Sequence, residues 1–311
     1  MDRFEINILG CGSASPSLLH HPSSQVVNHR ERIFMIDCGE GSQLQAFKMH
    51  LPLSRLTDIF ISHMHGDHCL GLPGLLSTLA LHDRGPASPV NVYLPKMGVD
   101  IVDRMVRFFC GGASYPVNLV PIEPGGGVLL ETKSLTVSAF PLYHRIPAFG
   151  FLMREKPKPR KLNAQVCDFF NVPLCQRGAI KDGADFITGD GLIIPNSRFT
   201  TDAPPSLSYA YCSDTMADDR VARAVEGVDL LYHEATYLDE LRGQAVERGH
   251  STALQAAEIA RKVDVGMLVI GHYSKRYVDP EPLLAEARSV FPATVAAHEF
   301  DRFTVSARGK D

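Results

Sequence analysis

The six-residue segment His63–His68, with the sequence His-Met-His-Gly-Asp-His, constrains this chain more than any other stretch. It follows a short apolar run, Asp58–Ile61, typical of a buried strand, and precedes an apolar pattern of helical spacing, Leu70–Leu81. Alternate side chains of an extended segment share a face, so we expect His63, His65 and Asp67 to converge. Imidazole and carboxylate donors suit zinc or a similar first-row ion. The segment therefore predicts a metal site just beyond a strand.

Short apolar runs bounded by turn residues recur along the chain and predict further buried strands. They are Phe4–Leu9, Ile33–Ile36, Val90–Leu94, Val117–Pro121, Val128–Glu131, Leu135–Pro141, Ser208–Cys212, Leu230–His233 and Met267–Gly271. Helices are predicted at Thr252–Lys262, with Ser251 as the N-cap, and near Pro282–Val290. Two successive blocks of strands followed by helices favour a layered α/β sandwich.

Composition excludes several classes of protein. Hydrophobic residues make up 45% of the 311 and charged residues 21%, which excludes wholesale disorder. No apolar run reaches the roughly 18 residues that a membrane span needs. Seven scattered cysteines without a Cys-x-x-Cys pair indicate neither a disulfide framework nor a zinc ribbon. The N-terminus resembles no targeting signal, so we expect a cytoplasmic protein. The net charge of −4 does not indicate a nucleic-acid binder, although binding follows local patches.

Three isolated polar residues each follow a predicted strand. His144 comes after Leu135–Pro141, Asp214 after Ser208–Cys212 and His272 after Met267–Gly271. Each alone would be an ordinary loop residue, but together with residues 63–68 they complete two sets of metal ligands. A carboxylate such as Asp214 can bridge two ions, and a pair of ions about 3.5–4 Å apart can clamp both reacting oxygens of a displacement.

One long stretch, Arg154–Thr201, lacks regular apolar patterns and is rich in Gly and Pro. It begins with five basic residues among eight, namely Arg154, Lys156, Lys158, Arg160 and Lys161. Long irregular insertions in compact domains are usually functional or disordered. A solvated loop is the alternative interpretation of the charges.

The ligand pattern of residues 63–68 with His144, Asp214 and His272 resembles the metallo-β-lactamase superfamily. Further segments resemble one of its members, the ribonuclease Z family of tRNA 3′-processing endonucleases. They are Asp37–Gly41, Gly71–Leu75, His233–Thr236, His250–Thr252 and His272–Tyr277. The resemblance, from about Ile6 to Ala297, implies an α/β fold, an αββα metallo-β-lactamase sandwich of two facing sheets with outer helices. It implies a single domain, 1–311, with an inserted substrate-binding arm at about 154–201.

The same resemblance implies a function and its residues. The chain would be a zinc-dependent endoribonuclease that removes the 3′ trailer from precursor tRNA, leaves a 3′-hydroxyl on the tRNA, and acts as a cytoplasmic homodimer. His63, His65 and His144 would hold one Zn²⁺, and Asp67, His68 and His272 the other, with Asp214 shared. Asp67 would accept a proton, and Glu234 would orient His250 to protonate the leaving oxygen. Arg276 and the five basic residues of the arm would contact RNA.

Other interpretations remain open at this point. The superfamily also hydrolyses small phosphodiesters and other esters, and a fold alone does not settle function. A metal-containing RNA-binding protein without turnover is a further possibility, although all seven ligand positions are filled. Glu234 could instead be a structural carboxylate that only holds a metal-ligating histidine.

Overall fold

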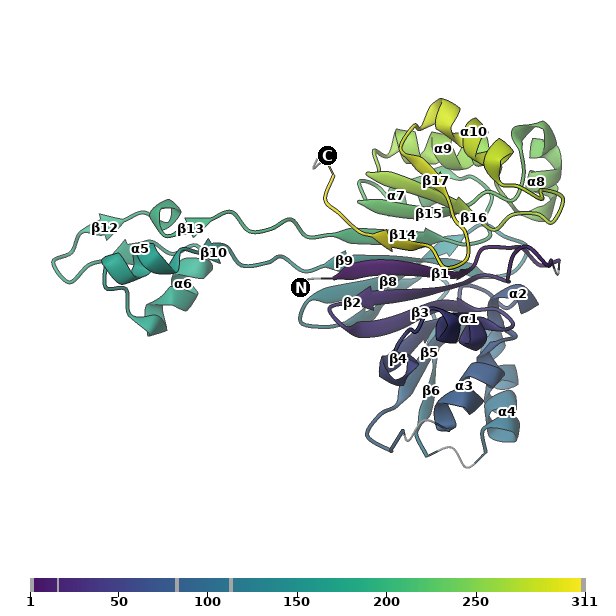
Figure 1. Cartoon of the computed structure of the whole chain (residues 1–311), viewed down its shortest axis with the longest axis horizontal. Coiled ribbons are helices and arrows are strands. Elements are labelled where there is room, and N and C mark those ends of the chain that lie inside the picture. Colours follow the sequence, from purple (N-terminus) through teal and green to yellow (C-terminus); the bar gives the residue numbers. More distant parts are fainter. Residues whose placement is uncertain (1–2, 16, 82–83, 112–113, 309–311) are drawn as a thin grey trace. The chain divides into compact units, whose positions relative to one another are not determined.

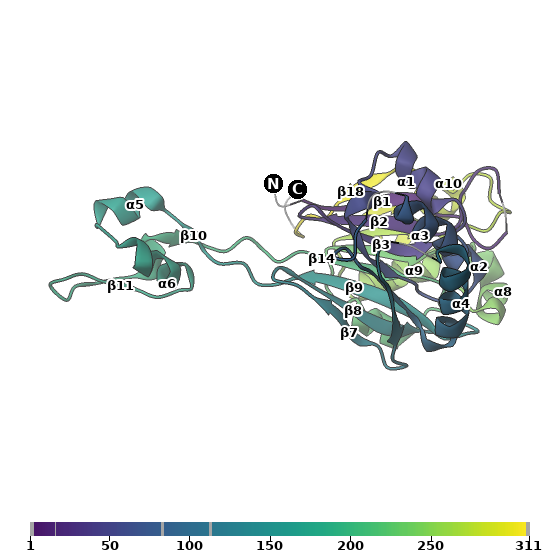
Figure 2. The same ribbon diagram turned by 90° about the horizontal axis from the view of Figure 1, so that it is seen from below.

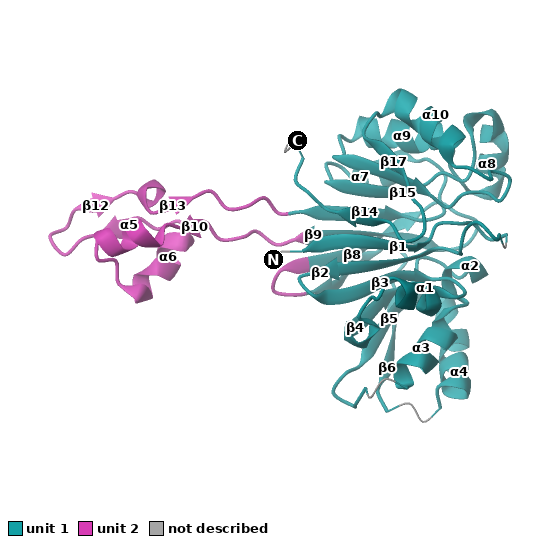
Figure 3. Ribbon diagram, in the orientation of Figure 1, with its two compact units in different colours: residues 1–131, 136–154, 207–311 teal, residues 132–135, 155–206 magenta. Residues whose placement is uncertain are grey.

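The computed structural model describes residues 3–15, 17–81, 84–111 and 114–308. The chain forms two compact units (Figure 3). Unit 1 contains residues 1–131, 136–154 and 207–311, and unit 2 contains residues 132–135 and 155–206. The ends of the chain and residues 16, 82–83 and 112–113 lie outside the described residues. No helix in the described ranges combines the length and apolar character that crossing a membrane requires.

The first sheet of unit 1 has seven strands in the order β18-β1-β2-β3-β4-β5-β6. Their bounds are β1 Phe4–Gly10, β2 Ser24–His29, β3 Arg32–Cys38, β4 Leu56–Phe60, β5 Val90–Pro95, β6 Val117–Ile122 and β18 Arg302–Thr304. The strands from β3 to β6 run parallel, whereas β18, β1, β2 and β3 pair antiparallel.

The second sheet also has seven strands, in the order β17-β16-β15-β14-β9-β8-β7. Their bounds are β7 Gly127–Glu131, β8 Leu135–Leu142, β9 Ala148–Glu155, β14 Ser208–Cys212, β15 Leu230–Glu234, β16 Met267–Gly271 and β17 Thr294–Ala296. Strands β14 to β17 are parallel, and β9 joins β14 antiparallel. The parallel strands place their carboxyl ends at one edge of the sheet.

Helices lie on the outer faces of the two sheets (Figures 1 and 2). On the first sheet they are α1 Ser42–Lys48, α2 Gly66–Cys69, α3 Leu72–Ala80 and α4 Val99–Phe109. On the second they are α7 Asp219–Ala224, α8 Arg242–Arg248, α9 Ala253–Lys262 and α10 Glu281–Val290. Unit 1 also contains the short 3₁₀ helices η1 Leu53–Arg55, η2 Lys96–Gly98 and η5 Asp239–Leu241. The layers of unit 1 are therefore helix, sheet, sheet and helix.

Aromatic side chains join the inner faces of the two sheets. The ring of Phe60 on β4 lies 5.5 Å, centroid to centroid, from that of Phe151 on β9. The hydroxyl of Tyr209 on β14 donates to the amide oxygen of Gln25 on β2. Each of these four side chains is almost fully buried, and aromatic burial contributes a large share of core stability. This hydrogen bond satisfies the buried amide oxygen of Gln25, whereas its Nε2 makes no hydrogen bond to any described residue.

All the predicted strands appear in the structure, with ends shifted by at most two residues. The structure also contains elements that the sequence analysis did not predict. Strand β2 was not predicted because it contains the polar residues Ser24, Gln25 and Asn28 and so forms no apolar run, although it is buried. The N-cap of α9 is Thr252 rather than Ser251, because the Thr252 side chain and Gln255 form a reciprocal capping box. The predicted helix Leu70–Leu81 is α3, Leu72–Ala80.

Unit 2 has a small core of its own. Its elements are β10 Lys161–Leu162, α5 Ala164–Phe169, η3 Leu174–Gln176, α6 Arg177–Lys181, β11 Phe186–Ile187, β12 Ile193–Ile194, η4 Asn196–Arg198 and β13 Thr200–Thr201. Strand β10 pairs with β13, and β11 pairs with β12. The buried cluster is Cys167, Val172, Ile180, Phe186, Ile194 and Phe199. The stretch predicted to be irregular therefore folds into short elements around Phe199.

Candidate metal centre

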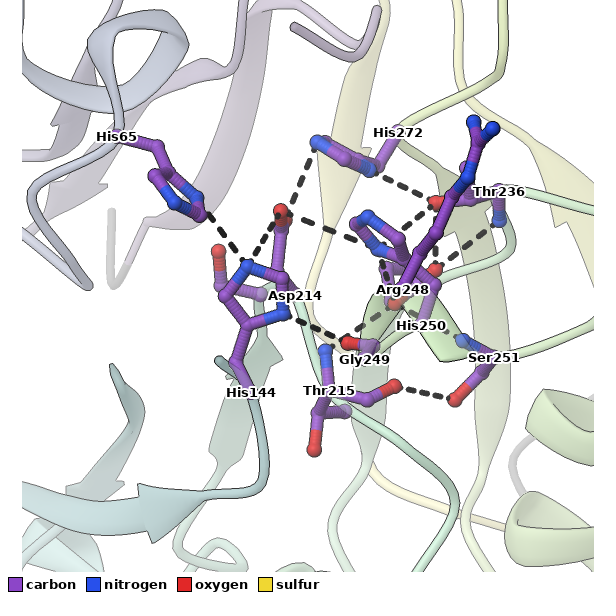
Figure 4. Close-up of polar contacts among 12 residues, drawn as sticks. His65, His144, Asp214, Thr215, Thr236, Arg248, Gly249, His250, Ser251 and His272 are labelled. Atoms are coloured by element: carbon purple, nitrogen blue, oxygen red, sulfur yellow. Dashed lines mark hydrogen bonds and ion pairs between the residues drawn. The ribbon is translucent and has the colours of Figure 1, made fainter. Parts of the chain in front are cut away.

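Two groups of possible metal ligands meet in unit 1. The first contains His63, His65, His144 and Asp214, and the second contains Asp67, His68, Asp214 and His272. Within each group the donor atoms all lie within 4.8 Å of one another. Figure 4 shows His65, His144 and His272 around Asp214. The structure thus brings together all seven side chains that the sequence singled out as ligands, with Asp214 common to both groups.

The ends of strands position these side chains. His63 and His65 follow β4, His144 follows β8, Asp214 follows β14 and His272 follows β16. The expected alternation of His63, His65 and Asp67 ends at His65, because the chain then turns into the short helix α2. That turn takes Asp67 out of the first group and places it with His68 in the second.

The two carboxylate oxygens of Asp214 face different groups. Oδ2 lies 3.6 Å from His63 Nε2 and 3.9 Å from His144 Nε2. Oδ1 lies 3.3 Å from His68 Nε2 and 3.1 Å from His272 Nε2. This is the arrangement that a carboxylate needs if it gives one oxygen to each of two ions.

The chemistry of the donor set fits metal ions. His68 Nε2 and Asp214 Oδ1 are buried and make no hydrogen bond to any described residue, and such orphaned polar atoms are costly unless an ion satisfies them. Burial lowers the pKa values of His63, His65 and His144. A lower pKa favours the neutral imidazole, which is the form that binds a metal.

Outer hydrogen bonds hold three of the histidines by Nδ1. Asp37 Oδ2 lies 2.7 Å from His68 Nδ1, the Gly249 carbonyl 2.7 Å from His144 Nδ1, and Thr236 Oγ1 2.9 Å from His272 Nδ1. In each ring Nε2 is then left to face the centre. Such partners fix the tautomer and orientation of a ligating imidazole.

Sequence reasoning assigned no role to these three partners. Asp37 offered a signal, because it is a charged residue at the end of the apolar strand β3 and is fully buried. It also accepts hydrogen bonds from the backbone and hydroxyl of Ser62 and from Tyr211. Gly249 acts through its carbonyl, which residue type does not reveal.

Glu234 and His250 lie together as expected. Glu234 Oε1 is 3.0 Å from His250 Nδ1, and the fully buried carboxylate also accepts the backbone N–H groups of Thr215, Thr236 and Ser251. Burial lowers the pKa of His250, but the charge of Glu234 outweighs it and raises that pKa to about 9. Glu234 Oε2 also accepts from Thr236 Oγ1, which reaches His272. Both interpretations of Glu234 therefore have a contact that supports them.

Two arginines, Arg276 and Arg145, lie near His250 and the candidate metal ligands. Arg276 is exposed, its guanidinium lies 5.4 Å from the centroid of the Tyr237 ring, and it donates to Gln244. Tyr237 in turn packs against His250, with ring centroids 6.1 Å apart. Arg145, which the sequence analysis did not single out, lines a cavity of about 610 Å³ together with His65 and Asp67. That cavity gives the donor groups an opening to solvent.

The five basic residues at the start of the predicted arm differ in their surroundings. Lys158 pairs with Glu155 and donates to the Pro205 carbonyl. Arg160 pairs with Asp202 and donates to Thr200. Arg154 and Lys161 are exposed, and Lys156 is half-buried. Lys158 and Arg160 therefore already make ion pairs within the chain.

Curated relatives match nearly the whole chain. Proteins named Ribonuclease Z are 46% identical in Bacteroides thetaiotaomicron, covering 96% of this chain and 94% of the relative, and 48% identical in Porphyromonas gingivalis, covering 96% and 98%. The Ribonuclease Z of Parabacteroides distasonis is 46% identical, covering 98% of this chain and all of the relative. A family model described as Anti-Pycsar protein Apyc1 matches residues 4–102.

Solved structures share the fold. Human tRNase Z, short form, superposes with a TM-score of 0.70 at 24% identity, covering 97% of this chain and 99% of the other. The metallo-beta-lactamase fold protein YhfI from Bacillus subtilis also gives a TM-score of 0.70, at 17% identity, covering 97% and 100%.

Proposed function

The chain belongs to the ribonuclease Z family, and from this membership and the metal centre we propose how it works. It is a metal-dependent hydrolytic endoribonuclease of tRNA 3′ processing. Its α/β fold is the expected metallo-β-lactamase sandwich. The finer statement is that it cuts precursor tRNA after the tRNA portion, releases the 3′ trailer and leaves a 3′-hydroxyl, and that it does so in the cytoplasm.

A single observation carries the proposed mechanism, namely that Asp214 turns one oxygen to each of two ligand groups. In this proposal His63, His65 and His144 hold one Zn²⁺, Asp67, His68 and His272 hold the other, and Asp214 joins them. When bound, such a pair would supply a nucleophile at neutral pH and neutralise charge on the phosphate. The remaining steps fall to protein side chains.

Asp67 and His250 would handle the protons. Asp67 lines the cavity, where it would accept a proton from the attacking water. His250, oriented by Glu234 through the 3.0 Å contact to Nδ1, would give its other ring proton to the departing ribose O3′. A general acid of this kind contributes about 10²–10⁴-fold in rate. Arg276 would hold a phosphate of the RNA at the rim.

Two substrates with different leaving groups test the role of His250. We expect His250→Ala to lower single-turnover cleavage of precursor tRNA by about 10²-fold or more, because the ribose alkoxide needs a proton to leave. Hydrolysis of bis(p-nitrophenyl) phosphate should fall far less, because nitrophenolate leaves without protonation. Arg276→Ala is the comparison variant, because it removes a proposed phosphate contact at the rim of the site but leaves the proposed general acid His250 in place. An equal loss on both substrates would contradict the general-acid role.

The alternative substrate class is tested by mapping the cut. We expect one cut at the tRNA–trailer junction of a precursor tRNA, with a 3′-hydroxyl on the tRNA product. Activity confined to bis(p-nitrophenyl) phosphate would instead favour a hydrolase of small phosphodiesters or other esters. We also propose that residues 155–206 form the arm that holds the tRNA, supported by the exposed Lys161 and the separate core around Phe199.

We propose a homodimer as well. Helix α4 and its neighbours expose large apolar side chains, which monomers seldom gather in one area. These are Leu70, Met97, Ile101, Phe108 and Phe109. A cavity of about 320 Å³ next to them is lined by Met64, Leu70, Ile101 and Met105, among others. Analytical ultracentrifugation should find a dimer that Ile101→Asp converts to a monomer, and a wild-type protein that stays monomeric at micromolar concentration would refute this.

A further inference from the structure

Three donors meet at a second place in unit 1, outside the metal centre. Cys11 follows β1, His20 lies in the loop between β1 and β2, and Glu299 lies between β17 and β18. Cys11 is fully buried, and the side chains of His20 and Glu299 are only 10% and 11% exposed. Residues that are 288 positions apart thus converge on one small polar cluster inside the fold.

The donor atoms lie close enough together to share one tetrahedral ion. Cys11 Sγ lies 3.5 Å from His20 Nδ1 and 3.6 Å from Glu299 Oε1, and His20 Nδ1 lies 3.1 Å from Glu299 Oε2. Ordinary zinc bonds to sulfur, nitrogen and oxygen at tetrahedral angles separate the donors by about 3.4–3.6 Å. The sulfur–nitrogen and sulfur–oxygen distances fall in this interval and the nitrogen–oxygen distance is slightly shorter. The two contacts of Glu299 use different oxygens, so the carboxylate would give one of them to the ion.

The Cys11 sulfur has more polar neighbours than its single S–H group can bond to. The Ala297 carbonyl, His20 Nδ1 and Glu299 Oε1 surround Cys11 Sγ at 3.3, 3.5 and 3.6 Å. A thiol donates one weak hydrogen bond, whereas Glu299 Oε1 already accepts from the His21 N–H and His20 Nδ1 contacts Glu299 Oε2, so the sulfur lies among donor atoms that it does not need to satisfy. A cation would draw the sulfur, the imidazole and the carboxylate together at once. Thiolate, imidazole and carboxylate are the usual ligands of zinc.

We propose that Cys11, His20 and Glu299 bind one transition-metal ion of the zinc class, separate from the catalytic pair. The Ala297 carbonyl or a water molecule would complete the fourth position. In the free protein, burial and the charge of Glu299 keep the pKa of the Cys11 thiol well above its usual value. Binding therefore forms a sulfur–metal bond, breaks the S–H bond and releases one proton to solvent.

The position of this cluster gives the ion a structural role near the active site. Glu299 Oε1 accepts the backbone N–H of His21 at 2.8 Å, and the His21 carbonyl accepts the N–H of Gly12 at 2.9 Å. His20, His21 and Pro22 line the same cavity as His65 and Asp67. An ion at Cys11 would fasten this wall of the cavity to the segment 297–301.

Cobalt substitution distinguishes this site from the catalytic centre. The seven catalytic ligands offer only nitrogen and oxygen, so a thiolate-to-cobalt charge-transfer band in the near ultraviolet requires a cysteine ligand. We expect the full chain, stripped of metal and titrated with Co²⁺, to develop this band with one equivalent of ion. Metal analysis of the zinc-loaded protein should give three ions per chain.

Variants make the assignment specific. Cys11→Ser should abolish the band and lower the zinc content from three ions to two, whereas Cys175→Ser, at an exposed cysteine, should change neither. Glu299→Gln keeps the thiol and should weaken Co²⁺ binding at this site about tenfold or more. This second variant decides the matter if Cys11→Ser fails to fold. No band in the loaded wild type, or a band that persists in Cys11→Ser, would overturn the proposal.

Discussion

The metal centre and the unit formed by residues 155–206 are built in opposite ways. The centre draws largely buried, titratable side chains from the ends of four strands and one short helix, and three of its histidines are each held by a second polar partner. Unit 2 gathers six apolar side chains from one continuous stretch of chain. Chemistry here depends on long-range placement, whereas the proposed recognition unit depends on local packing. The two should therefore fail separately when they are mutated.

The largest difference between loss of cleavage rate and loss of tRNA affinity is expected for a variant of the metal centre. His65→Ala removes one ligand and should lower precursor-tRNA cleavage by about 10³-fold or more, because charge stabilisation at the phosphate is lost. tRNA affinity, measured by filter binding, should stay within about threefold. A fall in affinity that matches the fall in rate would mean that the centre and the binding surface are not separable.

A smaller effect should distinguish the two interpretations of Glu234. Glu234→Gln should lower tRNA cleavage about 10²-fold with a full complement of metal if the carboxylate mainly orients His250. Thr236→Val breaks the contact to His272 and should weaken metal affinity about 10–100-fold, while His250 keeps its 3.0 Å contact to Glu234 and loses only the longer 3.4 Å contact to Thr236. Metal analysis and single-turnover rates on both variants are the measurements. Metal loss in Glu234→Gln would favour the structural interpretation.

Unit 2 should unfold locally without disturbing the centre. Phe199 is fully buried and packs edge-on against Phe170 and Phe186. Phe199→Ala should cost about 3–5 kcal/mol of the stability of this unit. We expect faster proteolysis within residues 155–206 and roughly tenfold weaker tRNA binding, with bis(p-nitrophenyl) phosphate hydrolysis unchanged. Loss of both activities would show that the units are coupled.

The smallest effect concerns individual charges. Lys161→Ala should weaken tRNA binding a fewfold and reduce the slope of log affinity against log salt by about 0.7–0.9, because one phosphate contact is lost. Lys158→Ala is the matched control, since Lys158 is already paired with Glu155 and should change the slope little. Equal slopes for wild type and Lys161→Ala would remove Lys161 from the RNA surface.

The sequence was more informative about the metal centre than about unit 2. The seven candidate ligands could be predicted because four of them cluster in residues 63–68 after an apolar strand and the other three each follow a further apolar strand. The placement of Asp67 in the second group was implied only by the family resemblance, because Gly66–Cys69 has no apolar periodicity that would predict the helical turn. The carbonyl of Gly249 and the hydroxyl of Thr236 act through geometry that residue type does not encode. The elements of unit 2 were missed because they are short and separated by Gly and Pro.

The shared position of Asp214 has a consequence for when the proposed centre could form during synthesis. Neither ligand group is complete until the ribosome has passed residue 214, and the second also waits for His272, close to the end of the chain. The histidines at 63, 65 and 68 therefore leave the exit tunnel long before their partners. In the proposed centre both ions would therefore be held only after residue 272 has been made, and a product truncated before that residue would lack one of the candidate ligands.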